Sequence, residues 1–209
     1  ELIQKSDFVG NLGKWAERIS SVLQRYQTNR VFQNWWTPLT PPYIIEHWPK
    51  IYNQHPGPLS GNEKPDFGGK WMCGTAVTAA RILYLLELGE EDPRNLTTES
   101  TVHMVNSRLD EGQLVRVQTH NIAEIIAACR SEWIVNSDTA DKQRGKFDKL
   151  VWTAQKELLA TEYENVGQVL KDIAEGRITS VEKDGRATNF NVGILERVKA
   201  AAINMYPTK

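Results

Sequence analysis

The hydrophobic residues of this chain recur mostly every three or four positions, the spacing that places them on one face of a helix. The pattern predicts a first helix within residues 6–26. Residues 75–88 are apolar on nearly every side, which favours a helix at the centre of a bundle. Gly89 is expected to end that helix.

The middle of the chain continues the helical pattern. Thr97 or Thr98 is expected to cap a helix that buries Val102, Val105 and Leu109. The short run 114–117 is interpreted either as a strand or as the entry to the next helix, over 122–133. Residues 143–153 would close the bundle. Further helices are expected around 166–173 and 194–205, with a tight turn at 183–186 between them.

Residues 37–70 break this pattern, because seven of the nine prolines of the chain lie there. Tyr43, Ile44, Trp48 and Ile51 are among the apolar residues of the same segment. Disordered linkers are poor in such residues, so the segment is expected to be irregular but packed. The predicted fold is therefore all-α: an elongated up-down four-helix bundle over 1–153, with an irregular Pro-rich loop at 37–70 and an α-rich C-terminal extension over 154–209.

Composition restricts the function classes. The 25 basic and 26 acidic residues give a net charge of −1, which argues against a strongly basic nucleic-acid-binding domain but allows a few phosphate contacts repeated along a polymer. Two cysteines are too few for a disulfide framework. No apolar run approaches the length of a membrane span, and no signal peptide is visible, so a soluble intracellular protein without a membrane partner is expected.

Cys73 is the sharpest candidate for catalysis. Trp71-Met-Cys73-Gly before a long apolar helix is similar to the nucleophile helix of papain-like peptidases and amidases, with His103 or His120 as base and Asn121 or Asp110 as the orienting group. The simpler interpretation, a small buried residue at a helix start, is favoured. His47, His55, His103 and His120 share no ligand spacing, so neither metal nor cofactor is expected.

Five short motifs, in order, carry a family resemblance. They are Phe8-Val with Trp15-Ala, Gln27-Thr-Asn-Arg30, Asp92-Pro-Arg94-Asn95, Thr97-Thr98 with Arg108-Leu-Asp110-Glu111, and Arg144 with Phe147-Asp148 and Trp152. Together they resemble the coat proteins of rod-shaped plant viruses of the tobamovirus, benyvirus, hordeivirus and tobravirus kind.

The resemblance implies a structural protein and not an enzyme: a helical capsid subunit that polymerises with itself around single-stranded RNA, in a virion assembled in the host cytoplasm. Phosphate contacts would come from Arg94, Asn95, Arg30, Arg108 and Arg116. An aromatic girdle between subunits would use Phe8, Trp15, Phe147 and Trp152. Asp110 and Glu111 would act as a carboxylate switch that loosens the assembly as the acids ionise. The alternatives are the Cys73 peptidase or amidase and a nucleoprotein of flexible filaments.

Overall fold

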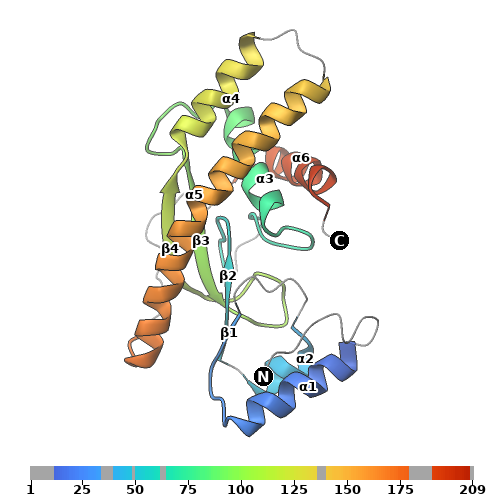
Figure 1. Cartoon of the computed structure of the whole chain (residues 1–209), viewed down its shortest axis with the longest axis vertical. Coiled ribbons are helices and arrows are strands. Elements are labelled where there is room, and N and C mark those ends of the chain that lie inside the picture. Colours follow the sequence, from blue (N-terminus) through green and yellow to red (C-terminus); the bar gives the residue numbers. More distant parts are fainter. Residues whose placement is uncertain are drawn as a thin grey trace.

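A four-stranded mixed sheet lies at the centre of the chain, with helices on both faces (Figure 1). The structure is a computed structural model that describes residues 12–33, 40–48, 50–61, 65–135, 140–178 and 190–207, without the side chains of 12 and 132–142. All statements below concern these residues.

The strands are β1 (Val31–Gln33), β2 (Ile51–His55), β3 (Thr97–Met104) and β4 (Leu114–Asn121), and they lie in that order. β1 pairs with β2 in parallel, whereas β3 is antiparallel to both β2 and β4. The register places Asn53 opposite His103 and His55 opposite Thr101. Because alternate residues of a strand point to opposite faces, these four residues share one face and Gln54 and Val102 share the other.

Helices α1 (Leu12–Arg25) and α2 (Pro42–His47) form the lower end of the molecule in Figure 1. Ala16 of α1 packs against Ile44, Trp48 and Ile51 in a small separate core. This cluster contains the start of β2 and therefore anchors the strand that carries two of the candidate site residues.

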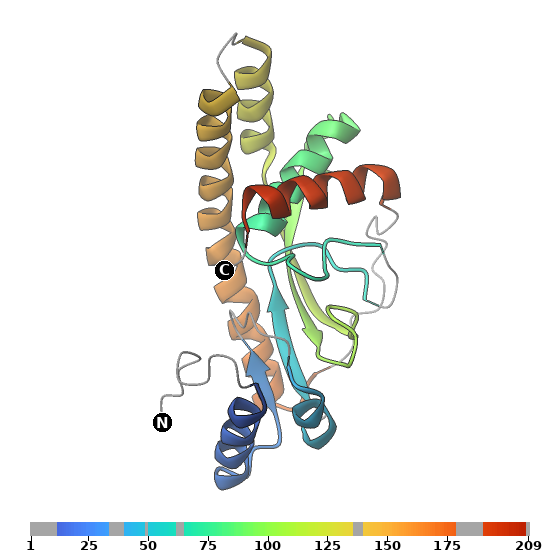
Figure 2. The ribbon, with the colours of Figure 1, turned by 90° about the vertical axis from the view of Figure 1, so that its right-hand side faces the viewer.

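The main core lies between α3 (Thr75–Leu88), α4 (Ala123–Val135), α6 (Val192–Met205) and the first part of α5 (Ala140–Ala174). The helix predicted over 75–88 is confirmed, and Gly89 ends it with φ 68° and a backbone N–H bond to Leu85. Figure 2 shows α6 lying across α3. Asn191 caps α6 by accepting a hydrogen bond from the Ile194 N–H.

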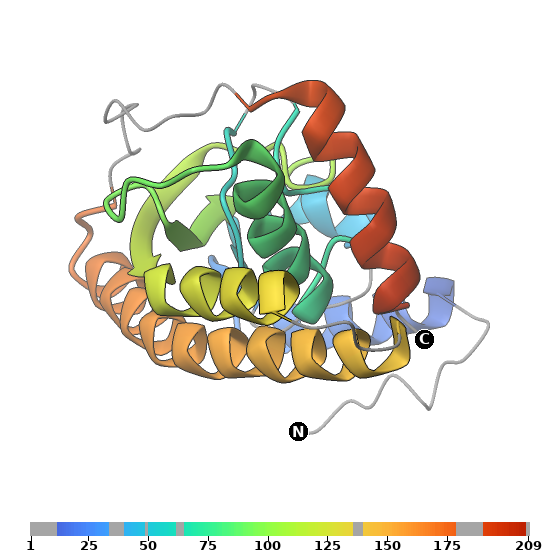
Figure 3. The ribbon, with the colours of Figure 1, turned by 90° about the horizontal axis from the view of Figure 1, so that it is seen from above.

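The 35-residue helix α5 joins the two layers. Its first part contributes Phe147, Val151 and Ala154 to the main core. Its later part covers one face of the sheet, where Val169 packs on Tyr52 and Val102. Seen from above, α5 is an outer layer on one side of the sheet, with α3 and α6 on the other side (Figure 3).

The predicted all-α four-helix bundle was wrong. Residues 97–104, expected as a helix, form β3, which is buried on both faces and therefore shows no simple alternation of apolar and polar residues. The strand interpretation of 114–117 is confirmed and extends to Asn121. The Pro-rich segment is packed but contains α2 and β2. The boundary expected at 153/154 falls within α5, the division into two domains remains a prediction, and the turn at 183–186 lies outside the described residues.

The connection between β3 and β4 is unusually tight at Gly112. The Met104 N–H donates to the Gln113 carbonyl at 2.8 Å. A Cβ atom on Gly112 would lie 1.5 Å from the Met104 carbonyl oxygen, which belongs to the backbone and cannot move aside. The register also shifts between Val102 and His103 just before this turn. Only glycine therefore fits here.

Replacing Gly112 by Ala should destabilise the protein by about 3 kcal/mol or more, because the turn must open to relieve the clash. The free energy of unfolding from urea titration measures this. Gly167→Ala is the matched control: a Cβ there meets nothing within 4 Å, and the change within α5 should stabilise by roughly 0.5–1 kcal/mol. Equal effects of the two substitutions would contradict this account of the turn.

Polar residues of α5 are buried against α3 and the sheet. Asn165 donates to the Ser100 carbonyl at 2.8 Å, and Gln155 accepts from the Thr78 hydroxyl. Glu162, which is 2% exposed, lies near Gln54 of β2. Burial raises the pKa of the Glu162 carboxyl to about 7, although the nearby Gln54 amide lowers it somewhat. The fold therefore favours a protonated Glu162.

Wild-type stability should fall as pH rises from 5 to 8, because the pKa of Glu162 is higher in the folded state than in the unfolded chain. Ionisation then costs the folded state on the order of 2 kcal/mol above pH 8. Glu162→Gln should remove this loss, measured as urea unfolding free energy against pH. Glu164→Gln, an exposed position two residues further on, is the control and should leave the pH dependence unchanged.

Candidate active site

Three polar side chains gather on the face of the sheet opposite α5. Asn53 and His55 come from β2 and His103 comes from the neighbouring β3, opposite Asn53. His55 and His103 are each 3% exposed, whereas Asn53 is only partly buried. The Asn53 Oδ1 atom is buried without a hydrogen-bond partner. Buried polar atoms without a partner are rare in folded proteins, and a bound ligand is one explanation for such an atom.

Asp110 completes the cluster from the β3–β4 connection. One carboxylate oxygen lies 3.8 Å from His55 Nδ1, and the other lies 3.6 Å from His103 Nε2. Both distances are within ion-pair range but exceed a direct hydrogen bond. Asp110 adopts φ 57°, a left-handed conformation that Asp tolerates better than most residues. The backbone turn thus directs the carboxylate between the two imidazoles.

Each histidine also meets a backbone carbonyl. His55 Nε2 lies 3.2 Å from the Phe67 oxygen, and His103 Nδ1 lies 3.0 Å from the Met104 oxygen. Each ring therefore has a carbonyl at one nitrogen and a carboxylate near the other, and both groups are hydrogen-bond acceptors. The cluster thus combines two imidazoles, a carboxylate and the Asn53 amide on one face of the sheet.

The loop between β2 and α3 encloses this cluster. Asp66, fully buried, accepts hydrogen bonds from the Ser60 N–H at 2.8 Å and the Gly68 N–H at 2.8 Å. Lys199 of α6 donates to the Asp66 and Gly68 carbonyls. The Gly69 N–H then donates to Asp110 at 2.9 Å. The loop is thus fixed at both the core and the candidate site.

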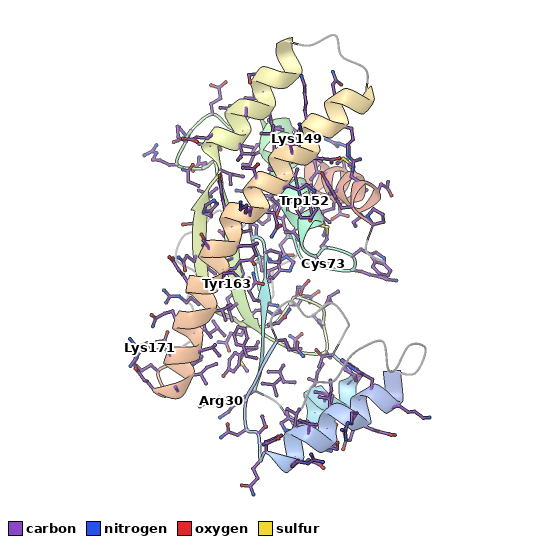
Figure 4. All side chains as sticks on the ribbon, viewed as in Figure 1. Arg30, Cys73, Lys149, Trp152, Tyr163 and Lys171 are labelled. Atoms are coloured by element: carbon purple, nitrogen blue, oxygen red, sulfur yellow. The ribbon has the colours of Figure 1, made fainter. Side chains whose placement is uncertain are left out.

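Cys73 lies just before the first turn of α3 (Figure 4). Burial raises the pKa of its thiol, and the negative charge of Asp110 raises it further. A thiol in this environment is a poor nucleophile. Of the bases proposed for it, His103 belongs to the cluster, but His120 lies on the opposite face of the sheet, 3.7 Å from Glu157, and Asn121 bonds to the Pro93 carbonyl. The alternative prediction, a peptidase or amidase with Cys73 as nucleophile, was therefore wrong.

The residues predicted to bind RNA do not converge. Arg94 is 88% exposed in the turn before β3, where it pairs with Asp92 at 2.6 Å and Asn95 bonds to Glu90. Arg108 follows β3 and pairs with Glu111 at 3.5 Å. Arg30 donates to the Ile173 carbonyl at the end of α5, and Arg116 is half-buried on β4. The eight-residue strand β3 separates Arg94 from Arg108, so these side chains form no single surface.

Three of the four residues of the predicted girdle are described, and they are also scattered. Phe147 is buried in the main core and Trp15 is buried in α1, so neither side chain is available to a neighbouring subunit. Trp152 is 59% exposed on the outer side of α5 (Figure 4). Phe8 lies outside the described residues. Asp110 was predicted as a carboxylate switch with Glu111, but the structure brings it instead to His55 and His103.

Asn53 was missed at the sequence level. His55 was considered only as a metal ligand, and His103 only as a metal ligand or as a base for Cys73. The available signal was Asn53-Gln-His55 followed by Pro-Gly-Pro, that is, polar residues at the end of a short apolar run. The surrounding prolines concealed the strand. Among the described residues, no group of three or more His, Cys, Asp or Glu is arranged to hold a metal ion. None of the helices in the described ranges has both the length and the apolar composition needed to cross a membrane.

No protein-family model matches the sequence. No curated protein matches it either. Matches were found among solved structures, including these two. Glycinamide ribonucleotide transformylase 1 from Symbiobacterium toebii superposes with TM-score 0.52 and 19% identity over 87% of this chain. Phosphoribosylglycinamide formyltransferase from Anaplasma phagocytophilum gives TM-score 0.49 and 21% identity over 81%. This chain spans 65% and 62% of the two proteins, respectively.

These findings overturn the capsid interpretation. The fold is an α/β arrangement shared with the S. toebii transformylase, and not the up-down bundle of a rod-shaped virus coat protein. The predictions of a non-enzymatic capsid subunit, of single-stranded RNA and a helical homopolymer as partners, and of a virion location were therefore wrong. The flexible-filament nucleoprotein, which assumed the same all-α design, falls with them.

Cys73 should react slowly with iodoacetamide at pH 8, and Asp110→Asn should accelerate the reaction, because removing the negative charge lowers the thiol pKa. The rate is measured by mass spectrometry in a Cys129→Ala background, so that Cys73 is the one cysteine that can react. Burial raises the pKa of Cys129 to about 12, so Cys129 itself is expected to contribute little. Glu111→Gln, beside Asp110 but paired with Arg108, should leave the rate unchanged. An equal acceleration by both variants would show that Asp110 exerts no local effect.

Proposed function

We propose that this chain carries the reaction centre of a formyltransferase, in which Asn53, His55 and Asp110 transfer a formyl group from a donor nitrogen to an acceptor amine. The observation that carries the proposal is the His55–Asp110 pair, buried beside the partly accessible Asn53 amide on one sheet face. The fold similarity to the S. toebii transformylase supports the same reaction class.

Formyl transfer passes through a tetrahedral intermediate whose former carbonyl oxygen carries negative charge. Donors fixed in advance at that oxygen provide the largest electrostatic contribution in such sites. The Asn53 amide N–H and a ring N–H of His55 project from alternate positions of the same strand, on the same face. Together they form a two-donor site for the developing oxyanion.

Asp110 supplies the acceptor for the proton of the attacking amine. As the new C–N bond forms, the amine proton passes to the Asp110 carboxylate; as the donor C–N bond breaks, the proton passes to the departing nitrogen. Protons therefore balance over the cycle. The gaps of 3.8 and 3.6 Å between Asp110 and the two histidines allow these contacts to shorten when substrate binds.

His103 acts through Asp110. His103 Nε2 lies near Oδ1 of Asp110, whereas His55 lies near Oδ2. The Met104 carbonyl lies at the other ring nitrogen of His103. A positive or dipolar partner on that side holds the carboxylate in place and restrains its rotation. His103 is therefore a positioning residue, whereas Asn53, His55 and Asp110 face the reacting atoms.

His55→Asn and Asp110→Asn should each lower kcat for formyl transfer by roughly 10²–10⁴-fold with the fold retained, because the first removes a donor to the oxyanion and the second removes the proton acceptor. The assay follows transfer of a labelled formyl group from a formylated folate to glycinamide ribonucleotide, the acceptor in the name of the S. toebii protein. Circular dichroism checks folding.

Slow hydrolysis of the donor without acceptor provides a second readout that does not depend on the choice of amine. His47→Asn is the matched control, because His47 is exposed at the end of α2, where it contacts the Tyr43 carbonyl away from the cluster. Wild-type protein that neither transfers nor hydrolyses the formyl group, or activity that survives in both site variants, would refute the proposal.

A further inference from the structure

Trp71 is a conformational outlier beside the candidate active site. Its φ is 70°, and only Gln27 and Asp110 are the other non-glycine residues with positive φ in the described part of the chain. A bulky residue in the left-handed region is strained, and such strain persists where the surroundings or a function require it. The backbone here would suit Gly or Asn better.

The turn that carries Trp71 is attached directly to the cluster. The Met72 N–H donates to the Gly69 carbonyl at 3.0 Å, and the Cys73 N–H donates to the Trp71 carbonyl at 3.2 Å. At the start of the same turn, the Gly69 N–H donates to the Asp110 carboxylate at 2.9 Å. Trp71 is therefore on the rim of the candidate site, two residues from a group that touches Asp110.

Packing does not account for the indole. Met72, the next residue, is buried at 3% and anchors the turn in the main core, whereas Trp71 is 53% exposed and belongs to none of the described core clusters. The ring contacts the Lys70 ammonium, which lies 5.0 Å from the ring centroid. The indole ring is thus held at the surface beside a positive charge, although the left-handed backbone conformation of Trp71 is unfavourable for a bulky residue.

We propose that Trp71 and Lys70 form a stacking subsite at the rim of the candidate active site, which binds a flat heteroaromatic substrate that carries a negative group. The indole offers a face to any π-system, and Lys70 attracts the anion. This rests on the proposed function, because the subsite would hold one of the two substrates of the transfer. Neither residue touches the reacting atoms, so both govern affinity.

Two substitutions separate the ring from the backbone strain. Trp71→Asn removes the ring and places at this position a residue that tolerates the left-handed conformation. Trp71→Phe keeps an aromatic ring and also keeps the backbone strain. With AMP as the probe, measured by calorimetry, Trp71→Asn should raise Kd at least about fivefold, whereas Trp71→Phe should stay within about threefold of wild type. Thermal unfolding should show Tm higher by roughly 3–5 °C for Trp71→Asn only.

Lys70 is tested through the charge of the probe. Wild type should bind AMP more tightly than adenosine, and Lys70→Gln should abolish that difference. Ribose 5-phosphate, which has the anion without the ring, should bind weakly and show no dependence on residue 71. Trp152→Gln, at an exposed tryptophan of α5, is the matched control and should leave AMP binding unchanged.

The proposal is overturned if wild type does not bind AMP, or if Trp71→Asn binds it as tightly as wild type. Its failure is distinguishable from failure of the proposed function. His55→Asn should abolish transfer while retaining AMP binding. Trp71-dependent binding by a protein without transfer activity would refute only the formyltransferase proposal, and transfer with a KM unaffected by Trp71→Asn would refute only the subsite.

Discussion

The position of the Asp110 carboxylate is the constraint on which the candidate site depends. It is set by backbone and not by side-chain flexibility: Asp110 takes a left-handed conformation, and Gly112 passes so close to Met104 that no Cβ fits. The register shift between Val102 and His103 immediately precedes this turn. The same carboxylate accepts the Gly69 N–H, so one acid joins the β3–β4 connection to the loop before α3. Movement of the turn would therefore displace both sides of the site at once.

The central strands β2 and β3 are rich in polar residues, yet most of these residues are buried. β2 alternates Asn53 and His55 on the site face with Tyr52 and Gln54 on the α5 face, and only Asn53 of the five residues is partly exposed. Buried polar groups destabilise a fold unless they are paired. On the α5 face the pairing is incomplete, and Glu162 remains preferentially protonated. On the site face the Asn53 Oδ1 atom is buried without a hydrogen-bond partner.

Much of the helical part of the fold could be predicted from sequence, because α3 and α6 carry regular apolar spacing and clear ends at Gly89 and Asn191. The sheet could not. Val102, Val105 and Leu109 match a helical face by spacing, yet Val102 lies in a strand and the other two lie beyond it. Of the candidate site, Asp110 was singled out for another role. His55 was not, because its significance comes from residues far away in the sequence. It lies opposite Thr101 of β3, 46 residues further on, and near the Asp110 carboxylate, 55 residues further on, and no local pattern encodes such contacts.

The coat-protein motifs each have a local structural cause. Asp92-Pro-Arg94 is a turn closed by its own ion pair, and Arg144 and Asp148 pair one helical turn apart, with Arg144 also bonded to the Met205 carbonyl. Such arrangements arise in many folds, so their order along a chain is weak evidence of ancestry. The left-handed Asp110 and Trp71 are more informative, because local preferences oppose them. Trp71 lies two residues from Gly69, whose N–H donates to the Asp110 carboxylate, so two of the three non-glycine residues with positive φ in the described ranges lie close together. Departures from local preference that gather at one place indicate function more reliably than matches to local preference spread along the chain.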